Sequence, residues 1–475
     1  MPVHILASTV SAAIPTEYWA SLAAACISIS MLKTWSRGPS LLEPPTTSDS
    51  FTDLHGRIIL IASGAFTPLG VVTLSSLAHR GAQLIALTPD ISAPEVLQMI
   101  HLIRDSTQSE PVYAEQCDLG DLESISAFAA LWNAGDKGQK EGVRRLDGLL
   151  FLPPGREELQ RVRLAESTKG RREEVYQLHV LARFHLVNSL LSSLLVQPRD
   201  REVRLVSVMS PFYAAGLGHF DLLATQTATT KGKGPKGQLQ TLSETSFSAL
   251  LGAASLRWYA LTLELQRRLD LLAEADPRPR TKLAGIDPES TSSTTFTHSG
   301  DIKDEAQRQM RQHSNISIVN VCPGFERTDL IDTFFPRSSS SSFIARIRGF
   351  LRWMVLLLLW PVVWLLAKSP ATAANSVVWG TTRKLEPLSM RYARILESLS
   401  PPQGKGKERE TRGWQDPVIP AEMYREGRIV RPQLPVRFGK RGEKQDAWAE
   451  LWKGEEMEVE RRIKALGGSI KRPKV

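Results

Sequence analysis

An apolar run that ends in a glycine turn constrains the fold of this chain more than any other feature. The run begins at Ile58, breaks at Gly64 and turns again at Gly70. Residues 71–81 then show helical spacing and end in a glycine, and a second apolar run covers 83–87. A strand, a glycine turn, a helix and a second strand form the unit that holds a dinucleotide pyrophosphate at a helix N-terminus. The sequence therefore predicts a turn of the nucleotide-binding kind near Gly64.

The same alternation of strand-like and helical segments continues along the chain. Further apolar runs with the length of strands lie at 112–118, 146–152, 203–210 and 316–321. Segments with helical spacing lie at 93–104, 122–132, 175–195 and 248–269. Most of the strands are apolar throughout, which is typical of a parallel sheet covered on both faces. We predict an α/β fold: a Rossmann-type, doubly wound parallel sheet in a single core domain with N- and C-terminal extensions.

Composition divides the chain into three parts. Residues 1–50 hold an N-terminal apolar segment and a linker, 51–400 the core domain, and 401–475 a charged C-terminal extension with one amphipathic helix. Within the core domain, 225–241 and 276–315 are rich in polar and turn-forming residues. Because such stretches cannot bury enough apolar surface to fold alone, we expect two mobile insertions there.

One helical face near the C-terminus carries large apolar side chains, and Gly467 ends the helix. We expect a surface helix docked on the core domain, with a helix that binds a protein partner as the alternative. The residues of this face are Trp448, Leu451, Trp452, Val459, Ile463 and Leu466.

Charge and cysteine content exclude several classes of function. The net charge of +9 suits an anionic membrane surface or nucleic acid. The basic residues form no single stripe, and no zinc-finger or RNA-binding signature is present, so we expect no nucleic acid partner. The three cysteines have no metal-ligand spacing and no disulfide pattern, so we predict no metal site and buried thiols in a reducing compartment.

Two uncharged apolar segments raise the question of a membrane. The first, residues 18–32, is short for a span of about 20 residues, and both a helix docked on the protein's own surface and membrane contact remain open. The second, 353–367 within a predicted membrane-interacting segment 350–367, would reach about 22 Å against a hydrocarbon core of about 30 Å. Its three tryptophans and basic flanks favour a helix in the bilayer interface over a buried helix. We therefore expect membrane lipid as a partner.

Several motifs resemble those of the short-chain dehydrogenase/reductase superfamily over about residues 57–385. Residues 63–70 are similar to its Thr-Gly-x-x-x-Gly-x-Gly cofactor turn, 117–119 to its adenine-side acid motif, and 323–328 to its Pro-Gly-x-x-x-Thr loop. The resemblance is closest to membrane-associated, retinol-dehydrogenase-like members and to a divergent fungal branch of unassigned function. It implies a cytosol-facing location at the endoplasmic reticulum and an NAD(P) cofactor. The implied cofactor-binding residues are Ser63, Gly64, Gly70, Asp118, Pro323, Gly324 and Thr328.

The cofactor turn departs from the family pattern at its middle glycine, where this chain has Pro68. Proline adds bulk and removes an N–H donor at a point where the backbone must approach the pyrophosphate. We therefore predict that NAD(P) binding is weakened or lost. The end of the second strand does not distinguish NAD from NADP.

The catalytic positions depart further. None of the seven tyrosines is followed four residues later by a lysine. In the resemblance, the family's tyrosine and lysine fall on Leu251 and Ser255, its asparagine falls on His179, and its serine is retained as Ser210. Loss of a positioned acid–base group typically costs about 10²–10⁴-fold in rate. Arg257 is an alternative source of charge near the ribose.

We hypothesise an oxidoreductase-like pseudoenzyme: a membrane-associated binding or scaffold protein with a degenerate catalytic site. The alternative is an active NAD(P)-dependent reductase or dehydrogenase of a lipophilic carbonyl or alcohol, with His179 and Ser210 as its polar pair. A third hypothesis is a sensor that binds NAD(P)H without turnover.

Overall fold

The computed structural model describes most of the core domain and parts of both extensions. The described residues are 19–39, 41–42, 53–135, 144–166, 170–198, 201–221, 223, 246–275, 314–334, 343–386, 390–392, 394–395, 417–438 and 445–468. The insertion expected at 225–241 lies outside them, as does the one at 276–315 apart from its last two residues. The chain forms two compact units, one from residues 1–40 and 325–372 and the other from 41–324 and 373–475.

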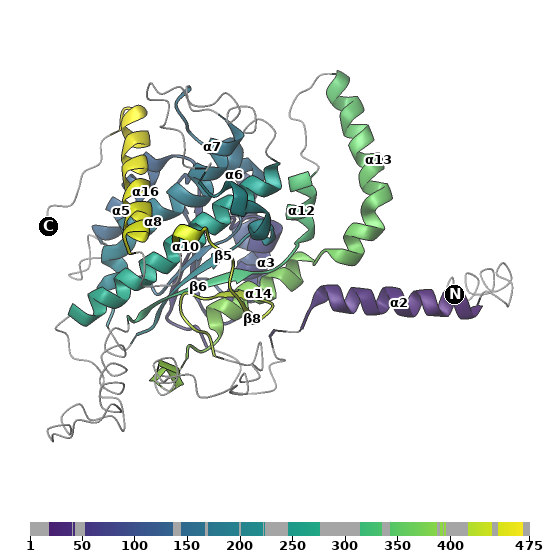
Figure 1. Ribbon diagram of the computed structural model, residues 1–475, viewed down its shortest axis with the longest axis horizontal. Helices are drawn as coiled ribbons and strands as arrows, with labels where there is room; N and C mark the ends of the chain where they lie inside the picture. The colour runs from purple at the N-terminus through teal and green to yellow at the C-terminus, as the bar shows by residue number, and fades with distance from the viewer. Residues whose placement is uncertain are drawn as a thin grey trace. The chain divides into compact units, whose positions relative to one another are not determined.

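The larger unit is built on a sheet of eight strands within the described residues (Figure 1). Its order is β3-β2-β1-β4-β5-β6-β7-β8, parallel except for the last pair, β7 with β8. The chain adds strands on one side of β1 and then on the other, so a topological switch point lies between β1 and β4. The strands are β1 (Ile58–Ser63), β2 (Gln83–Thr88), β3 (Val112–Gln116), β4 (Gly148–Phe151), β5 (Val203–Val208), β6 (Ile316–Cys322), β7 (Met423–Arg425) and β8 (Arg428–Val430).

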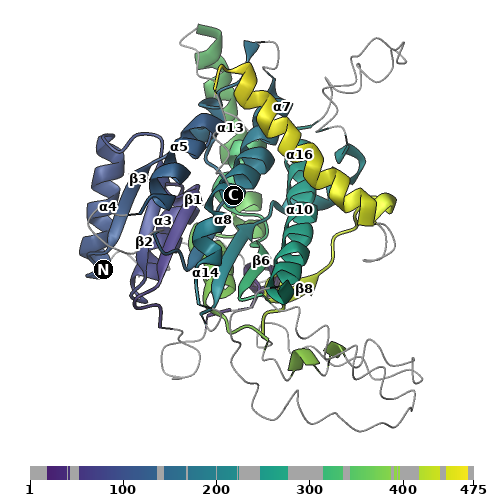
Figure 2. The same ribbon diagram turned by 90° about the vertical axis from the view of Figure 1, so that its left-hand side faces the viewer.

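Helices cover both faces of this sheet (Figure 2). Alternate residues of each strand point to opposite faces, so Ile59 and Ile61 of β1 join one apolar cluster and Leu60 and Ala62 the other. The helices of the first face are α3 (Pro68–Ala78), α4 (Pro94–Thr107) and α14 (Pro370–Thr382). Those of the second are α5 (Leu122–Asn133), α7 (Arg171–Tyr176), the π-helical turn η3 (Gln177–Leu181), α8 (Ala182–Leu195) and α10 (Phe247–Ala275). The predicted doubly wound α/β fold is confirmed.

The C-terminal extension takes part in the core of this unit. It supplies β7 and β8, which the sequence pattern did not reveal because each strand has only three residues. It also supplies α16 (Gln445–Ala465), which packs against α10, α5 and α8. Trp448, Leu451 and Trp452 of α16 are buried in the second-face cluster, as expected for a docked helix.

The smaller unit contains α2 (Trp19–Arg37), α12 (Arg327–Phe334) and α13 (Phe343–Leu366), and α2 packs against α13. The Lys33 ammonium of α2 donates hydrogen bonds to the carbonyls of Trp364 and Ala367 and lies 4.9 Å from the centre of the Trp364 ring. The last carbonyls of a helix lack partners within it, and a cation there is favourable. Lys33 thus joins the two apolar segments of the sequence.

Among the described residues, one helix is long and apolar enough to cross a membrane. It is the run Arg171–Leu195, formed by α7, η3 and α8, and 72% of its most apolar window is buried inside the protein. A helix buried in the core of a soluble protein can have the same length and the same apolar composition. All but the last residue of the apolar segment at 353–367 belongs to α13, whose 24 residues would span about 36 Å, longer than the segment alone.

Candidate functional site

The glycine turn lies at the switch point, where the carboxyl ends of β1 and β4 meet. The Ser63 hydroxyl donates to the carbonyl of Leu152 over 2.6 Å and ties the two strand ends together. Gly64 has a φ of +65°, and a Cβ atom there would lie 2.2 Å from the carbonyl oxygen of Pro153. Only glycine fits both the conformation and the space.

Pro68 fits the fold at the start of α3. It occupies the first turn of the helix, where its missing N–H breaks no helical hydrogen bond. Thr67 caps the helix: its Oγ1 accepts from the Gly70 N–H at 3.1 Å and donates to the Gly64 carbonyl at 2.7 Å. A Cβ atom on Gly70 would lie 2.0 Å from the same carbonyl oxygen. The turn keeps its shape, but Pro68 has no N–H and the N–H of Gly70 is already bonded.

An acidic side chain lies across the switch point. The Glu158 carboxylate accepts the N–H of Gly64 at 3.1 Å through Oε1 and the N–H of Gly155 at 3.1 Å through Oε2. Burial raises the pKa of Glu158 to about 7, although these two hydrogen bonds and the nearby Arg183 oppose the rise. The Nη2 of Arg183 donates to the Leu152 carbonyl at 3.1 Å. A carboxylate therefore already uses N–H groups of both loops that border the switch-point crevice, the place beyond the strand ends where an open α/β sheet binds its ligands.

Asp118 supports the loop after β3. Its Oδ1 accepts the N–H of Gly120 at 2.8 Å, and its own N–H donates to the Ser124 hydroxyl at 3.0 Å. Burial raises the pKa of Asp118, and the hydrogen bond from Gly120 acts in the opposite direction. The predicted adenine-side acid is thus engaged with its own backbone.

The predicted cofactor loop after β6 falls into both units. Pro323 and Gly324 are buried in the larger unit, and Gly324 has a φ of +89°. In the smaller unit, the Glu326 carboxylate caps α12. It accepts the Thr328 hydroxyl at 2.6 Å, the Thr328 N–H at 3.0 Å and the Asp329 N–H at 2.8 Å. The polar groups of Thr328 are therefore occupied by a side chain of the same loop.

Three of the predicted catalytic positions come together at the end of β5. The N–H of Ser210 donates to the Ser255 hydroxyl at 3.1 Å. Leu251 lies one turn earlier on α10, and both Leu251 and Ser255 are buried. The Ser210 hydroxyl accepts the N–H of Phe212 at 3.4 Å. The site thus has an aliphatic side chain and a hydroxyl where the resemblance places a tyrosine and a lysine.

His179 lies in the π-helical turn η3 and is buried. Burial, together with the charge of Arg183, lowers the pKa of His179 to about 3. Its Nε2 has no hydrogen-bond partner within the described part of the chain, so it is not bonded to Ser210. At neutral pH this ring is uncharged and holds no imidazolium proton to donate.

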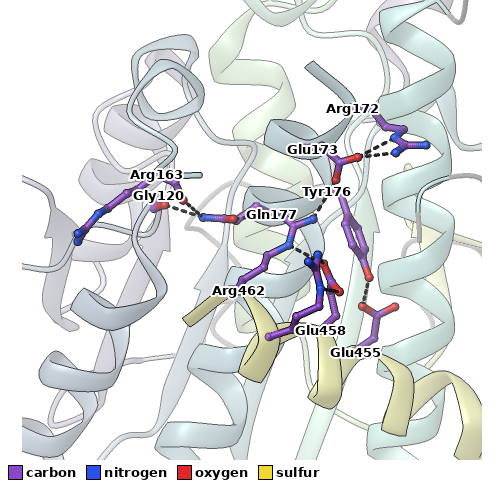
Figure 3. Close-up of polar contacts among 10 residues, drawn as sticks. Gly120, Arg163, Arg172, Glu173, Tyr176, Gln177, Glu455, Glu458 and Arg462 are labelled. Atoms are coloured by element: carbon purple, nitrogen blue, oxygen red, sulfur yellow. Dashed lines mark hydrogen bonds and ion pairs between the residues drawn. The ribbon is translucent and has the colours of Figure 1, made fainter. Parts of the chain in front are cut away.

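Arg257 does not supply charge to the crevice. It belongs to a buried polar network under α16, whose members Tyr176, Glu455 and Arg462 are drawn in Figure 3. The Nε of Arg257 donates to the Glu455 carboxylate. The Tyr176 hydroxyl donates to the same carboxylate. Further along α16, Arg462 donates to Glu173 at 2.9 Å. This network joins the C-terminal helix to α10 and α7.

Sequence reasoning missed Glu158, Arg183 and Glu326. One local signal points to Glu158: it lies three residues after Gly155, the spacing of a capping box at the start of a helix. That spacing predicts the bond to Gly155, but not the second bond to Gly64, which is 94 residues away in the sequence.

The chain is similar in sequence to two fungal oxidoreductases. No family model matches the chain. An uncharacterized oxidoreductase of Saccharomyces cerevisiae is 25% identical over 370 residues, which cover 77% of this chain and 75% of the relative. An uncharacterized oxidoreductase of Schizosaccharomyces pombe is 25% identical over 207 residues, which cover 42% of this chain and 50% of the relative.

Solved structures of similar architecture include two short-chain dehydrogenases of Shigella flexneri. One is 15% identical, with 80% of this chain and 95% of that chain covered and a TM-score of 0.38. The other, complexed with NADP, is 16% identical, with coverages of 67% and 94% and a TM-score of 0.32. The sheet order, the motifs at its carboxyl edge and the fungal relatives define an oxidoreductase-like chain with a short-chain dehydrogenase/reductase-like fold.

Proposed function

We propose that this chain is a membrane-associated binding or scaffold protein that keeps an oxidoreductase fold without the family's proton-transfer chemistry. One observation carries the proposal: Leu251 and Ser255 occupy the positions of the tyrosine and lysine, and the Ser255 hydroxyl is bonded to the backbone of Ser210. Carbonyl reduction by hydride transfer needs a proton at the developing alkoxide. Leucine cannot deliver one, and serine has no charge that could lower the pKa of a neighbour.

Turnover tests this proposal directly. The purified full-length chain would be incubated with a lipophilic ketone and NADH or NADPH, and separately with a lipophilic alcohol and the oxidised nucleotides. Consumption or formation of the reduced nicotinamide would be followed by absorbance. We expect no rate above that of the solution without protein. A saturable rate that is proportional to protein concentration would overturn the proposal.

The alternative function is an active NAD(P)-dependent reductase or dehydrogenase of a lipophilic substrate. The curated names of the two fungal relatives and the retained Ser210 favour it. It would require His179 to act as an uncharged ring, because burial holds its pKa at about 3. The same assay distinguishes the two functions, and a rate that survives replacement of both His179 and Ser210 would exclude this pair as its source.

The smaller unit supports the membrane part of the proposal. Large apolar side chains on α2 and α13 are exposed: Trp35 and Leu358 are each 76% exposed, and Trp353 is 56% exposed. Lys33 holds the two helices together at the end of α13. Tryptophan beside basic residues is typical of a helix at a lipid interface. We propose the cytosolic surface of the endoplasmic reticulum, because Lys33 and Arg37 follow the first apolar segment and basic residues favour the cytosolic side.

A vesicle assay with a matched pair of variants tests the lipid surface. Leu358 of α13 and Leu131 of α5 are similarly exposed, at 76% and 74%, but only the first belongs to the smaller unit. We expect the chain to sediment with vesicles that contain anionic phospholipid. Leu358→Asp should reduce the bound fraction severalfold, because charge on a lipid-facing helix opposes insertion, and Leu131→Asp should leave it unchanged. Equal binding by both variants would contradict the proposed surface.

A further inference from the structure

Glu158 holds an unusual place in the larger unit. It projects from the short helix α6 (Arg156–Gln160), yet its two carboxylate oxygens accept N–H groups from turns that follow two neighbouring strands. One donor is Gly64 after β1 and the other is Gly155 after β4. In an open α/β sheet, ligands bind beyond the carboxyl ends of the strands at such a switch point. Backbone N–H groups of a glycine turn are suited to bind an anion there.

The loops on either side of the Glu158 carboxylate lie close together. A Cβ atom on Gly155 would lie 3.3 Å from the Thr67 side chain, so the loop after β4 lies against the start of α3. The carboxylate of Glu158 therefore lies between two loops that are already close together. A diphosphate that approached the Gly64 turn would meet a negative charge and N–H groups that are already bonded.

The buried cation Arg183 lies close enough to act on the charge of the Glu158 carboxylate. Arg183 of α8 lowers the pKa of Glu158, whereas Asp118 after β3 raises it. Arg183 is 3% exposed, and its Nε has no hydrogen-bond partner among the residues that the structure describes. Removal of the Glu158 charge would leave Arg183 as an uncompensated cation below the crevice, and such a cation attracts phosphate.

We propose that the Glu158 carboxylate is an internal anion that excludes nicotinamide dinucleotides from the switch-point crevice and thereby sets which ligands it accepts. The dinucleotide can bind only after Glu158 releases the N–H groups of Gly64 and Gly155. The inference rests on the crevice of the proposed function, but not on the absence of turnover. Glu326 provides a parallel in the other predicted cofactor loop, since its carboxylate occupies the hydroxyl and N–H of Thr328.

Binding of NADH would be measured by fluorescence titration of the full-length chain. NADH is the suitable probe because its diphosphate does not titrate between pH 6 and pH 8. The variants are Glu158→Ala, which removes charge and acceptor, and Glu158→Gln, which removes the charge but keeps one acceptor oxygen. Glu157→Gln is the control, because Glu157 is the exposed acid next to it on the same helix. Circular dichroism would establish that each variant is folded.

At pH 8 we expect Glu158→Ala to bind NADH at least about tenfold more tightly than the native chain, and Glu158→Gln to show a smaller gain. Glu157→Gln should match the native chain. If NADH binds only the protonated form, a pKa of about 7 predicts that native affinity rises about tenfold from pH 8 to pH 6. Glu158→Ala should lose this pH dependence.

Two results would overturn the inference. One is a native chain that binds NADH as tightly as its Glu158 variants at both pH values. The other is a folded Glu158→Gln or Glu158→Ala chain that gains no affinity over the control. Neither result concerns turnover, so the titration can fail while the proposed lack of chemistry stands. Turnover by the native chain would refute the proposed lack of proton-transfer chemistry, but not the role of Glu158.

Discussion

Replacement of Glu455 should separate the C-terminal helix from the core domain. The Glu455 side chain is 0% exposed and accepts hydrogen bonds from Arg257, which is 7% exposed, and from Tyr176. Glu455→Ala would leave a buried guanidinium without its acid. Removal of one partner of a buried ion pair typically costs about 3–5 kcal/mol. We expect a loss of that size in the free energy of unfolding.

Urea denaturation followed by circular dichroism measures the loss, and hydrogen exchange of α16 peptides locates it. Glu456→Ala is the matched control, because Glu456 is the exposed acid next to Glu455. The double variant Arg257→Met with Glu455→Met removes both charges and should recover most of the stability, since apolar replacements of a buried pair are often neutral. If Glu455→Ala is no more destabilising than Glu456→Ala, the loss of the buried acid does not destabilise the chain as we predict. If the double variant is as unstable as Glu455→Ala, the loss comes from packing and not from the unpaired charge.

Two further predictions concern the crevice. Burial lowers the pKa of His179 to about 3 and that of His185 to about 4, so between pH 6.5 and these values the unfolded chain binds more protons. The contribution of the two histidines to stability should therefore fall as the pH drops below 6.5, by up to about 1.4 kcal/mol per pH unit for each histidine; His179→Leu should lower the slope of stability against pH between pH 6 and pH 4.5 by about this amount in urea melts, and an unchanged slope contradicts it. Gly64→Ala should destabilise the chain by at least about 2 kcal/mol more than Gly56→Ala. Both glycines have φ near +70°, but only at Gly64 would the new Cβ strike a backbone oxygen, 2.2 Å away on Pro153; equal thermal shifts for both variants would refute the clash.

The fold could be predicted because most of its first six strands are mainly apolar runs bounded by turns. β4 and β6 are buried along their whole length, and such strands carry a strong pattern in the sequence. β7 and β8 are too short to carry a pattern. β7 pairs with β6 from a part of the chain about 100 residues later, and β8 pairs with β7. The partners of a helix such as α16 depend on the tertiary arrangement. The spacing of apolar residues along the helix shows which face is buried, but not against what it packs.

The candidate site could be predicted only where it depends on position along one element. The spacing from Leu251 to Ser255 is a helical turn, and the hydrogen bond from Ser210 to Ser255 agrees with the predicted register. The pKa of His179 depends on burial, and the occupation of the Gly64 turn depends on a side chain from another loop. Neither has a signature in the local sequence.

The motif residues that the chain retains at the crevice all have packing roles. A Cβ atom would strike backbone oxygens at Gly64 and at Gly70, and the Ser63 hydroxyl joins β1 to β4. These contacts are enough to explain the glycine turn through stability of the fold alone. The turn by itself is therefore no argument for a bound nucleotide.

The replaced positions have the opposite character. A tyrosine and a lysine at 251 and 255 would act on a substrate and a cofactor, whereas Leu251 packs within the protein and the Ser255 hydroxyl bonds to its backbone. Glu158 also bonds within the chain. Its carboxylate accepts the N–H of Gly64, which is the group that a phosphate would need. A fold can keep its glycine turn for packing while the N–H of Gly64 and the hydroxyl of Ser255 bond to partners within the chain. The affinity of the Glu158 variants for NADH measures the effect of the occupied Gly64 turn. The turnover of the native chain measures separately the effect of the replaced catalytic positions.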